Sequence, residues 1–252
     1  TVGLAEVVNR TPNGTYGSIR FSDQQLKEIR YASLLHDFGK VGVREQVLVK
    51  AKKLQPERLE RIFQRLYQRD LEISLALLER AWREGQTPDE GAFQRLLEGR
   101  REESRRLVEL IARCNEPQVL PREVADRMDE LEVLEFAHFD GHRERILEPS
   151  DLKALRIPKG SLSAEERDEL NSHVTHTFRF LSQIPWTTGL AALPGIAYAH
   201  HERLNGMGYP RGLQSDQIPA QSKLMAVADV YDALVAADRP YKVAVTVPRS
   251  LE

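Results

Sequence analysis

The sequence predicts a mainly α-helical protein, and three observations lead to this expectation. Apolar residues recur at helical spacing over most of the chain, capping signals precede several of these stretches, and the sequence lacks a convincing series of alternating strands. The expected fold class is therefore all-α. With 252 residues, the chain is long enough for one large domain or two small ones.

The first clear helix lies in the stretch SDQQLKEIRYASLLHDFGK. Ser22 is followed three residues later by Gln25, which is the spacing of a capping box and predicts that the helix begins here. Gly39 suits the C-terminal end of the same helix. The apolar positions that roughly follow helical spacing are Leu26, Ile29 and Leu34.

The pattern changes between about residues 51 and 157, where long amphipathic stretches alternate with Arg and Glu. A first stretch and a second one, restarted at TPDEGAF with Thr87 as its N-cap, predict an antiparallel helical hairpin. We expect 51–157 to be a helical insertion within one domain, which is formed by 1–50 and 158–252. A further helix is predicted through Val124, Met128 and Leu131.

Three helical stretches are predicted after the insertion. SLSAEERDELNSHVTHTFRFL begins with Ser163 and Glu166 at capping-box spacing, and GIAYAHH and QSKLMAVADVYDALVAAD are apolar and rich in alanine. The last two are expected to be buried helices. One face of the first stretch would carry Leu170, His173, Val174, Thr177 and Leu181.

The composition limits the partners and the compartment. A formal net charge of −2 gives no argument for a nucleic-acid polymer or an anionic membrane as partner. The single cysteine, Cys114, excludes an internal disulfide and fits a reducing, cytoplasmic location. No apolar run approaches the ~20 residues that span a bilayer. Because the chain begins at Thr1, we expect a fragment of a longer protein.

Six polar groups lie where a core helix would favour apolar side chains. Each one alone has a structural explanation, such as a hydrogen-bonded core histidine or a locally paired aspartate. Together they offer imidazole nitrogens and carboxylate oxygens, which suit Fe, Mn or Zn and the hydrolysis of a phosphodiester. Lys40 would present a positive charge to a phosphate oxygen. The six residues are His36, Asp37, His173, His200, His201 and Asp229.

Four motifs follow one another along the chain: HDFGK (36–40), HHERLNGMGYP (200–210), AVADVYDAL (226–234) and DRPYK (238–242). In this order they closely resemble the motifs of the HD-GYP subfamily of HD-domain metal-dependent phosphohydrolases. The resemblance covers about 20–49 and 158–245. It implies an all-α HD-domain bundle that holds two or three Fe or Mn ions and hydrolyses cyclic di-GMP to pGpG or GMP in bacterial signalling.

The resemblance also implies individual roles. The six polar residues would be metal ligands, with Asp37 bridging two ions and acting with Lys40 in catalysis. Phosphate contacts would come from Lys40, Arg239 and Lys242, and Arg211 would add to a basic lining. Tyr209 would contact the substrate or shape its pocket, and Glu202 would orient a ligating imidazole.

The sequence departs from the family pattern in two respects. Compact family members lack the insertion, and a histidine that the family carries upstream of the HD pair would fall before Thr1. One or two metal ligands are therefore expected outside this chain. In the full-length protein we expect an attached sensory or receiver domain. The insertion would be a solvated hairpin or a homodimer contact through 51–157.

Other interpretations of these motifs stay open. The chain could be a catalytically silent sensor that binds a cyclic dinucleotide or a protein, or a phosphodiesterase for another cyclic dinucleotide such as cyclic GMP-AMP. His138 and His142 in HFDGH could form a separate metal pair, although Gly141 favours a surface loop. His176 would lie near the ligands or face solvent.

Overall fold

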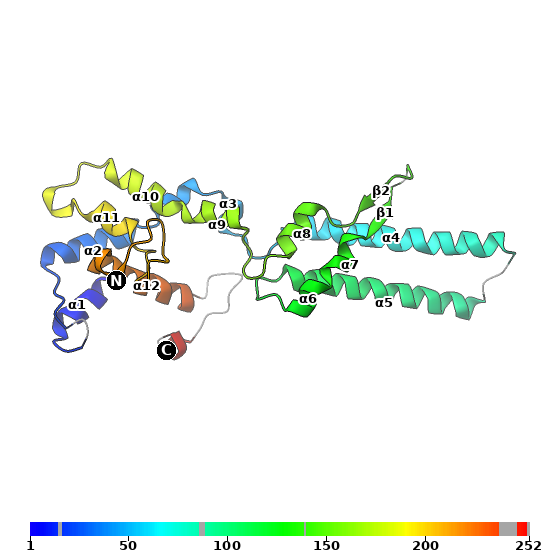
Figure 1. The fold of residues 1–252 in the computed structure, drawn as a ribbon, viewed down its shortest axis with the longest axis horizontal. Coiled ribbons are helices and arrows are strands. Elements are labelled where there is room, and N and C mark those ends of the chain that lie inside the picture. The colour runs from blue at the N-terminus through cyan, green and yellow to red at the C-terminus, as the bar shows by residue number, and fades with distance from the viewer. Residues whose placement is uncertain (15–16, 86–88, 139, 237–245, 251–252) are drawn as a thin grey trace. The chain divides into compact units, whose positions relative to one another are not determined.

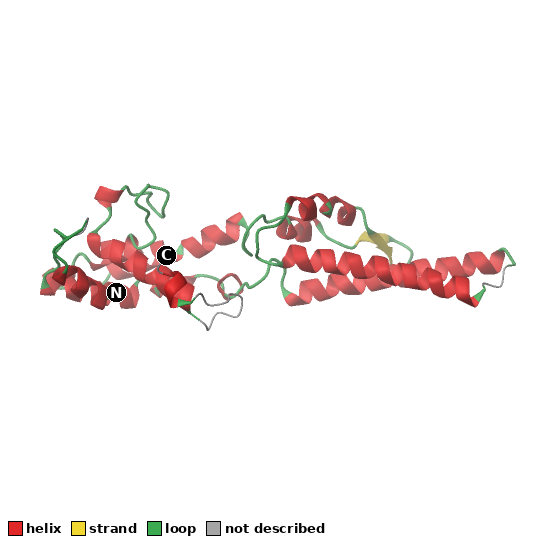
Figure 2. Ribbon diagram, turned by 90° about the horizontal axis from the view of Figure 1, so that it is seen from below, coloured by secondary structure: helices red, strands yellow, loops and turns green. Residues whose placement is uncertain are grey.

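The computed structural model describes residues 1–14, 17–85, 89–138, 140–236 and 246–250. As predicted, the fold is mainly α, and the described residues include a single short β-hairpin (Figure 2). The chain divides into two compact units. Unit 1 comprises Thr1–Val49 and Ala164–Glu252, and unit 2 comprises Lys50–Ser163. No helix in these described ranges is long and apolar enough to cross a membrane.

The helices of unit 1 come from both ends of the chain (Figure 1). They are α1 (Val2–Arg10), α2 (Asp23–Leu35), the 3-10 helix η1 (Phe38–Gly42), α3 (Glu45–Leu48), α9 (Ala164–Asn171), α10 (His173–Ser182), the 3-10 helix η2 (Thr188–Leu190), α11 (Leu193–Tyr198), the 3-10 helix η3 (Ser215–Gln217), α12 (Ala220–Val235) and α13 (Val247–Ser250).

The start of α2 is as predicted, and its end is not. Ser22 and Gln25 form the capping box with both hydrogen bonds in place. Leu34, however, is 73% exposed, so it lies outside the apolar face that buries Ile29. Gly39 does not end α2 but lies inside η1, where the chain turns sharply toward α10.

The core beneath the site joins four helices of unit 1. It is built mainly from small and aliphatic side chains, which allow α2, α10, α11 and α12 to approach closely. The hydroxyl of Ser222 on α12 donates to the carbonyl oxygen of Ile196 on α11 at 2.8 Å. The buried members are Ala32, Leu181, Leu193, Ile196, Ala197 and Met225.

Unit 2 is an antiparallel pair of long helices with smaller elements packed at its base. Its elements are α4 (Pro56–Arg83), α5 (Glu90–Asn115), α6 (Arg122–Asp126), α7 (Met128–Glu132), β1 (Glu135–Ala137), β2 (Arg143–Arg145) and α8 (Pro149–Leu155). The helical hairpin was expected. The predicted single helix through Met128 is two short helices, and the strand pair β1–β2 was not foreseen.

The N-cap of α5 and a hydrogen bond between the two ends of unit 2 add to what the sequence predicted. Helix α5 begins at Glu90 with Asp89 as its N-cap, whose side chain accepts from the backbone N–H of Ala92. The predicted cap Thr87 lies outside the described residues. At the other end of the unit, the hydroxyl of Ser161 donates to the carbonyl oxygen of Lys50 at 2.8 Å. The two ends of unit 2 are therefore held together.

Candidate metal centre

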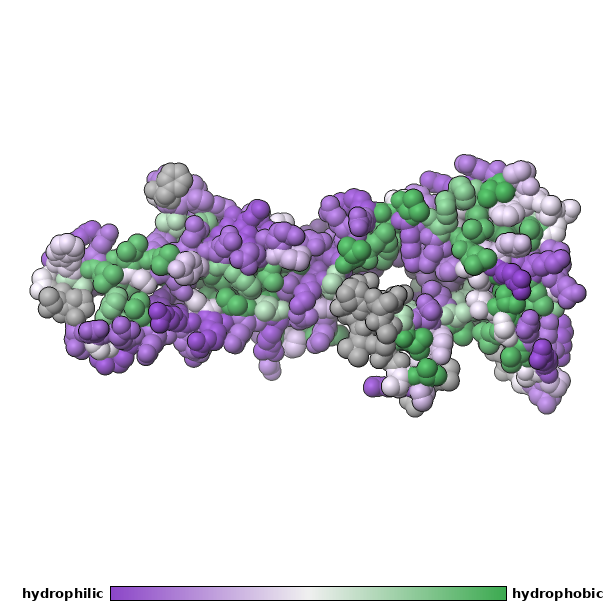
Figure 3. Space-filling model, turned by 180° about the vertical axis from the view of Figure 1, so that it is seen from behind, coloured by the Kyte–Doolittle hydropathy of each residue, from purple (hydrophilic) through white to green (hydrophobic). Residues whose placement is uncertain are grey.

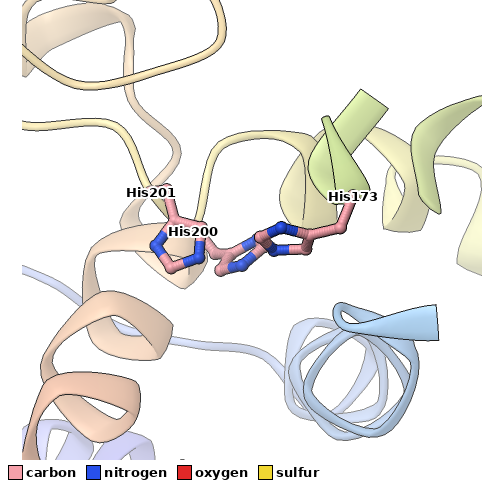
Figure 4. A group of neighbouring side chains, drawn as sticks. All are labelled: His173, His200 and His201. Atoms are coloured by element: carbon pink, nitrogen blue, oxygen red, sulfur yellow. The ribbon is translucent and has the colours of Figure 1, made fainter. Parts of the chain in front are cut away.

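The six predicted ligands converge in unit 1 from four helices, and together they are termed the His/Asp centre. His36 and Asp37 directly follow α2, His173 opens α10, and the pair His200 and His201 follows α11. Asp229 lies in the middle of α12. The imidazole rings of His200 and His201 lie 4.0 Å apart between centroids, and the ring of His173 faces both (Figure 4).

Three of the imidazoles share one local arrangement, in which Nδ1 bonds to the backbone carbonyl oxygen three residues earlier. A carbonyl oxygen only accepts, so Nδ1 carries the proton and Nε2 keeps its lone pair. Metal-ligating histidines are commonly oriented in this way. The pairs are His36 with Ser33 at 2.9 Å, His173 with Leu170 at 2.6 Å, and His200 with Ala197 at 2.6 Å.

Asp37 lies at the middle of the centre. Its Oδ1 is 3.3 Å from Nε2 of His173, and its Oδ2 accepts a hydrogen bond from Nζ of Lys40 at 2.6 Å. On the other side, Nε2 of His36 is 3.5 Å from Oδ2 of Asp37 and 3.9 Å from Oδ1 of Asp229. The Asp37 carboxylate thus lies between the imidazole of His36, which follows α2, and that of His173, which opens α10.

Three buried atoms of this centre have no hydrogen-bond partner: Oδ1 of Asp37, Nε2 of His173 and Nε2 of His200. Unpaired buried polar atoms destabilise a fold, so several at one place call for a missing partner. Two sets of donors, each within 4.8 Å, are His173–His200–His201 and His36–Asp37–His200. Nitrogen and carboxylate donors in these sets fit divalent transition-metal ions.

Burial and neighbouring charges shift the pKa values of several donors at the centre. Burial lowers the pKa of His200 to about 3 and that of His201 to about 4, with help from neighbouring imidazoles. Burial alone would raise the pKa of Asp37, but His173 and Lys40 hold it well below its usual range. For His36 burial is outweighed by the two nearby carboxylates, so its pKa is raised.

The turn after His201 packs beside the centre. The ring of Tyr209 stacks on that of His201 with centroids 4.8 Å apart, and burial raises the pKa of the Tyr209 hydroxyl. A Cβ on Gly208 would collide with the backbone nitrogen of Arg203 and lie 2.5 Å from Cα of Glu202. Only glycine lets this turn fold back onto the histidine pair.

The role predicted for Glu202 was wrong. Its buried carboxylate does not bond to an imidazole but accepts hydrogen bonds from the backbone N–H groups of Arg211 and Leu213, at 2.8 and 2.9 Å. Backbone carbonyls orient the imidazoles instead. Glu202 therefore fixes the loop that carries Tyr209.

The remaining predicted basic residues differ in placement. Lys40 is at the centre through its contact with Asp37. Arg211 lies on the surface with its guanidinium 4.7 Å from the ring centroid of Tyr198. Arg239 and Lys242 lie outside the described residues. His176 lies against Gly42, apart from the ligand sets.

The second histidine pair is a surface cluster, as the sequence favoured. His138, His142 and Glu144 meet across the turn after β1, where Gly141 has φ +87°. Here Nε2 of His138 pairs with Glu144 at 2.7 Å, and Nδ1 of His142 pairs with Asp140 at 2.5 Å. Hydrogen-bond contacts with carboxylates therefore account for this cluster without a metal.

One residue that positions the centre was missed. Thr177 is fully buried on α10, and its hydroxyl bonds to the main chain at both His36 and Gly39. The sequence placed it on an apolar face without assigning it a role. The signal was present, because a threonine one turn after His173 on that face needs hydrogen-bond partners.

The His-Asp pair at the end of one helix, joined by histidines and an aspartate from three others, defines the class of HD-domain proteins. Residues 130–252 match the family model described as HD domain. That match includes His173, His200, His201 and Asp229, whereas the His36–Asp37 pair lies before it. This match and the similarity to cyclic di-GMP phosphodiesterases are consistent with the HD-GYP subfamily of HD-domain proteins.

Three curated relatives are each similar to part of the chain, and the matched region spans less than a quarter of the length of each relative. The chain is 36% identical over 98 residues to 3'3'-cGAMP-specific phosphodiesterase 3 of Vibrio cholerae, covering 39% of this chain and 20% of the relative. It is 42% identical over 88 residues to the cyclic di-GMP phosphodiesterase of Thermotoga maritima, covering 35% and 23%. It is 54% identical over 56 residues to the cyclic di-GMP phosphodiesterase response regulator RpfG of Xanthomonas campestris, covering 22% and 15%.

Proposed function

We propose that this chain carries the catalytic centre of a metal-dependent phosphodiesterase that hydrolyses cyclic di-GMP to pGpG or GMP. The observation that carries the proposal is the convergence of unpaired buried donor atoms on Asp37, His173 and His200. Similarity to phosphodiesterases of cyclic dinucleotides supports the substrate class. Fe or Mn, in two or three sites, is the proposed metal because the resemblance to HD-GYP proteins implies it, and the nitrogen and oxygen donors of the His/Asp centre fit these ions.

Bound divalent ions would activate water and neutralise charge on the phosphate. The chain's own residues do the positioning. His36, His173, His200, His201 and Asp229 would hold the ions, with Asp37 between them. Lys40 keeps an ammonium group beside Asp37, where it would meet a phosphate oxygen. Tyr209 forms a wall next to His201, against which the ligand would lie.

A second candidate substrate is cyclic GMP-AMP. Several relatives with similar sequence are named as 3'3'-cGAMP-specific phosphodiesterases, including one that is 52% identical over 98 residues. Both dinucleotides carry the same two phosphodiester groups, so the His/Asp centre alone does not choose between them. A catalytically silent sensor is the third candidate function. Such a protein would bind the cyclic dinucleotide without hydrolysing it.

For the whole protein, we propose a cytoplasmic enzyme with an attached sensory or receiver domain and a homodimer contact through 51–157. The similarity to a response regulator supports the receiver domain. Arg239 and Lys242 stay proposed phosphate contacts.

The deciding experiment measures metal content and turnover on one anaerobically purified sample. The proposal expects Fe or Mn in the wild type, cleavage of cyclic di-GMP, and loss of both in Asp37→Ala. His176→Ala is the matched control, because this histidine lies outside the ligand sets. Cleavage of cyclic GMP-AMP alone would replace the substrate, and tight nucleotide binding without cleavage would make the protein a sensor.

A further inference from the structure

Helix α4 presents apolar side chains on two opposite faces. Its inner face buries Ile62 and Leu66 in the core of unit 2. Five large apolar side chains lie on the other face and are exposed to solvent, and they are termed the outer stripe. Their exposed fractions are 66% for Tyr67, 46% for Leu71, 59% for Leu75, 40% for Leu78 and 86% for Trp82.

The residues of the outer stripe do not belong to the contact between α4 and α5. Beyond Leu66, the contact between α4 and α5 includes polar side chains, with Asp70 accepting from the hydroxyl of Ser104 and lying 3.7 Å from Arg100. These polar contacts help to set the register of the two helices within one copy. The leucines of the stripe point elsewhere. A helix that is apolar on both faces is normally covered on both.

The spacing of the stripe is that of a coiled-coil seam. Leu71, Leu75, Leu78 and Trp82 are separated by four, three and four residues, so they alternate between the two core positions of a heptad. In the face shown in Figure 3, hydrophobic residues form a band along α4 and α5 with hydrophilic residues on both sides.

The area of the stripe fits a stable interface with one more helix. The five side chains expose on the order of 600 Å², which is at the upper end of the largest patch that a typical monomer carries. A standard interface buries about 800 Å² on each partner, so the stripe would supply most of that area. A second copy of this chain offers a seam of identical spacing.

We propose that the outer stripe joins two copies of the chain through a parallel pair of α4 helices. This gives the proposed homodimer contact a defined surface, and it does not depend on phosphodiesterase activity. Gln68 supports the parallel direction, because it continues the seam three residues before Leu71 and is exposed. In a parallel pair the two Gln68 amides meet and can bond to each other. In an antiparallel pair centred on the leucines, the Gln68 side chain of each copy would lie near Gly85 of the other copy, which has no side chain to bond to the amide.

The test is the oligomeric state of the full chain by sedimentation equilibrium. The wild type is expected to be a dimer, and Leu75→Lys with Leu78→Lys is expected to weaken dimerisation at least about 100-fold. The matched control is Val119→Lys with Val133→Lys, which alters two exposed valines of unit 2 outside the stripe. Circular dichroism should show equal helix content in all three proteins.

A single cysteine distinguishes the two directions. In the parallel pair, Trp82→Cys meets its own copy and should form an intermolecular disulfide on mild oxidation, while the native Cys114 is buried. In an antiparallel pair that position faces Leu71 of the other copy and should not crosslink to itself. A monomeric wild type, or a dimer that tolerates the two lysines, would overturn the proposal, and a dimer without the Trp82→Cys crosslink would overturn its parallel direction.

Discussion

The hydroxyl oxygen of Thr177 accepts a hydrogen bond from the backbone N–H of Gly39 at 2.8 Å, although the two residues are 138 positions apart in the sequence. The same hydroxyl donates to the carbonyl oxygen of His36 at 2.9 Å. Thr177 thus ties the turn that carries His36 and Asp37 to the helix that begins with His173. We expect the spacing between His36, Asp37 and His173 to depend on these two hydrogen bonds, which together are termed the clamp.

Replacing Thr177 by Val should separate the two parts of the centre. Valine keeps the shape but leaves the buried N–H of Gly39 without an acceptor, which should lower the free energy of unfolding by about 1–3 kcal/mol. Urea unfolding and metal content check this. Thr177→Ser should restore both, because it keeps the hydroxyl. Full metal content in Thr177→Val would show that the clamp does not position the ligands.

Replacing Gly39 by Ala should be more damaging. A Cβ there would collide with the carbonyl oxygen of His173 and lie 2.6 Å from the backbone nitrogen of Thr177. Because both are backbone atoms, α10 would have to move, and we expect a loss of about 3 kcal/mol in unfolding free energy together with reduced metal content. Gly195→Ala is the control, since a Cβ there meets nothing within 4 Å. Equal thermal stability of the two variants would contradict this account.

Replacing Glu202 by Ala should loosen the loop but spare the metals. The backbone N–H groups of Arg211 and Leu213 would lose their acceptor, and Tyr209 would lose its fixed place over His201. We expect a rise in KM of about tenfold or more, with metal content close to wild type. Steady-state kinetics with metal analysis tests this. A loss of metal would instead favour a direct role of Glu202 in orienting a ligand.

The metal-free protein should lose stability as the pH falls from about 6.5 to about 4. Burial lowers the pKa of His200 to about 3 and of His201 to about 4, whereas both titrate near 6.5 in an unfolded chain. In this window the unfolded state binds more protons, so the unfolding free energy decreases by about 1 kcal/mol per histidine per pH unit.

His36 acts in the opposite sense over a different range. Its raised pKa contributes stability that is fully present below about pH 6.5 and is lost as the pH rises through the raised value. Urea unfolding of chelator-treated protein at several pH values measures the sum. Replacing His200 and His201 together by Gln should flatten the acid slope, and an unchanged slope would assign it to other groups.

The convergence of the His/Asp centre could be predicted from the sequence because most of its residues lie in short motifs with fixed spacing. His36 and Asp37 are adjacent, His200 and His201 are adjacent, and the cap at Ser22 lies three residues from its partner. Local rules of this kind also account for the helices that carry the motifs. Their placement around one centre then follows from the resemblance to a known family.

The features that were missed depend on contacts between distant segments. Gly39 was interpreted as a helix end, because its close approach to His173 cannot be seen in the neighbouring sequence. Glu202 was given an imidazole partner, whereas its partners come from the loop that follows. Exposure of Leu34 and the pairing of β1 with β2 likewise depend on which elements pack together.

The hydrogen bond between Ser161 and Lys50 has a consequence for the order of folding. His36 and His173 are separated by a long stretch of chain, and closing so long a loop carries an entropic penalty that grows with its length. Unit 2 is contiguous, so it can fold by itself and bring its two ends together. The effective loop between the halves of the centre then shrinks to 14 positions from His36 to Lys50 and 12 positions from Ser161 to His173. Folding of unit 2 would thus lower the entropic penalty of bringing the two halves of the centre together. The centre can then form from segments whose ends are already close in space.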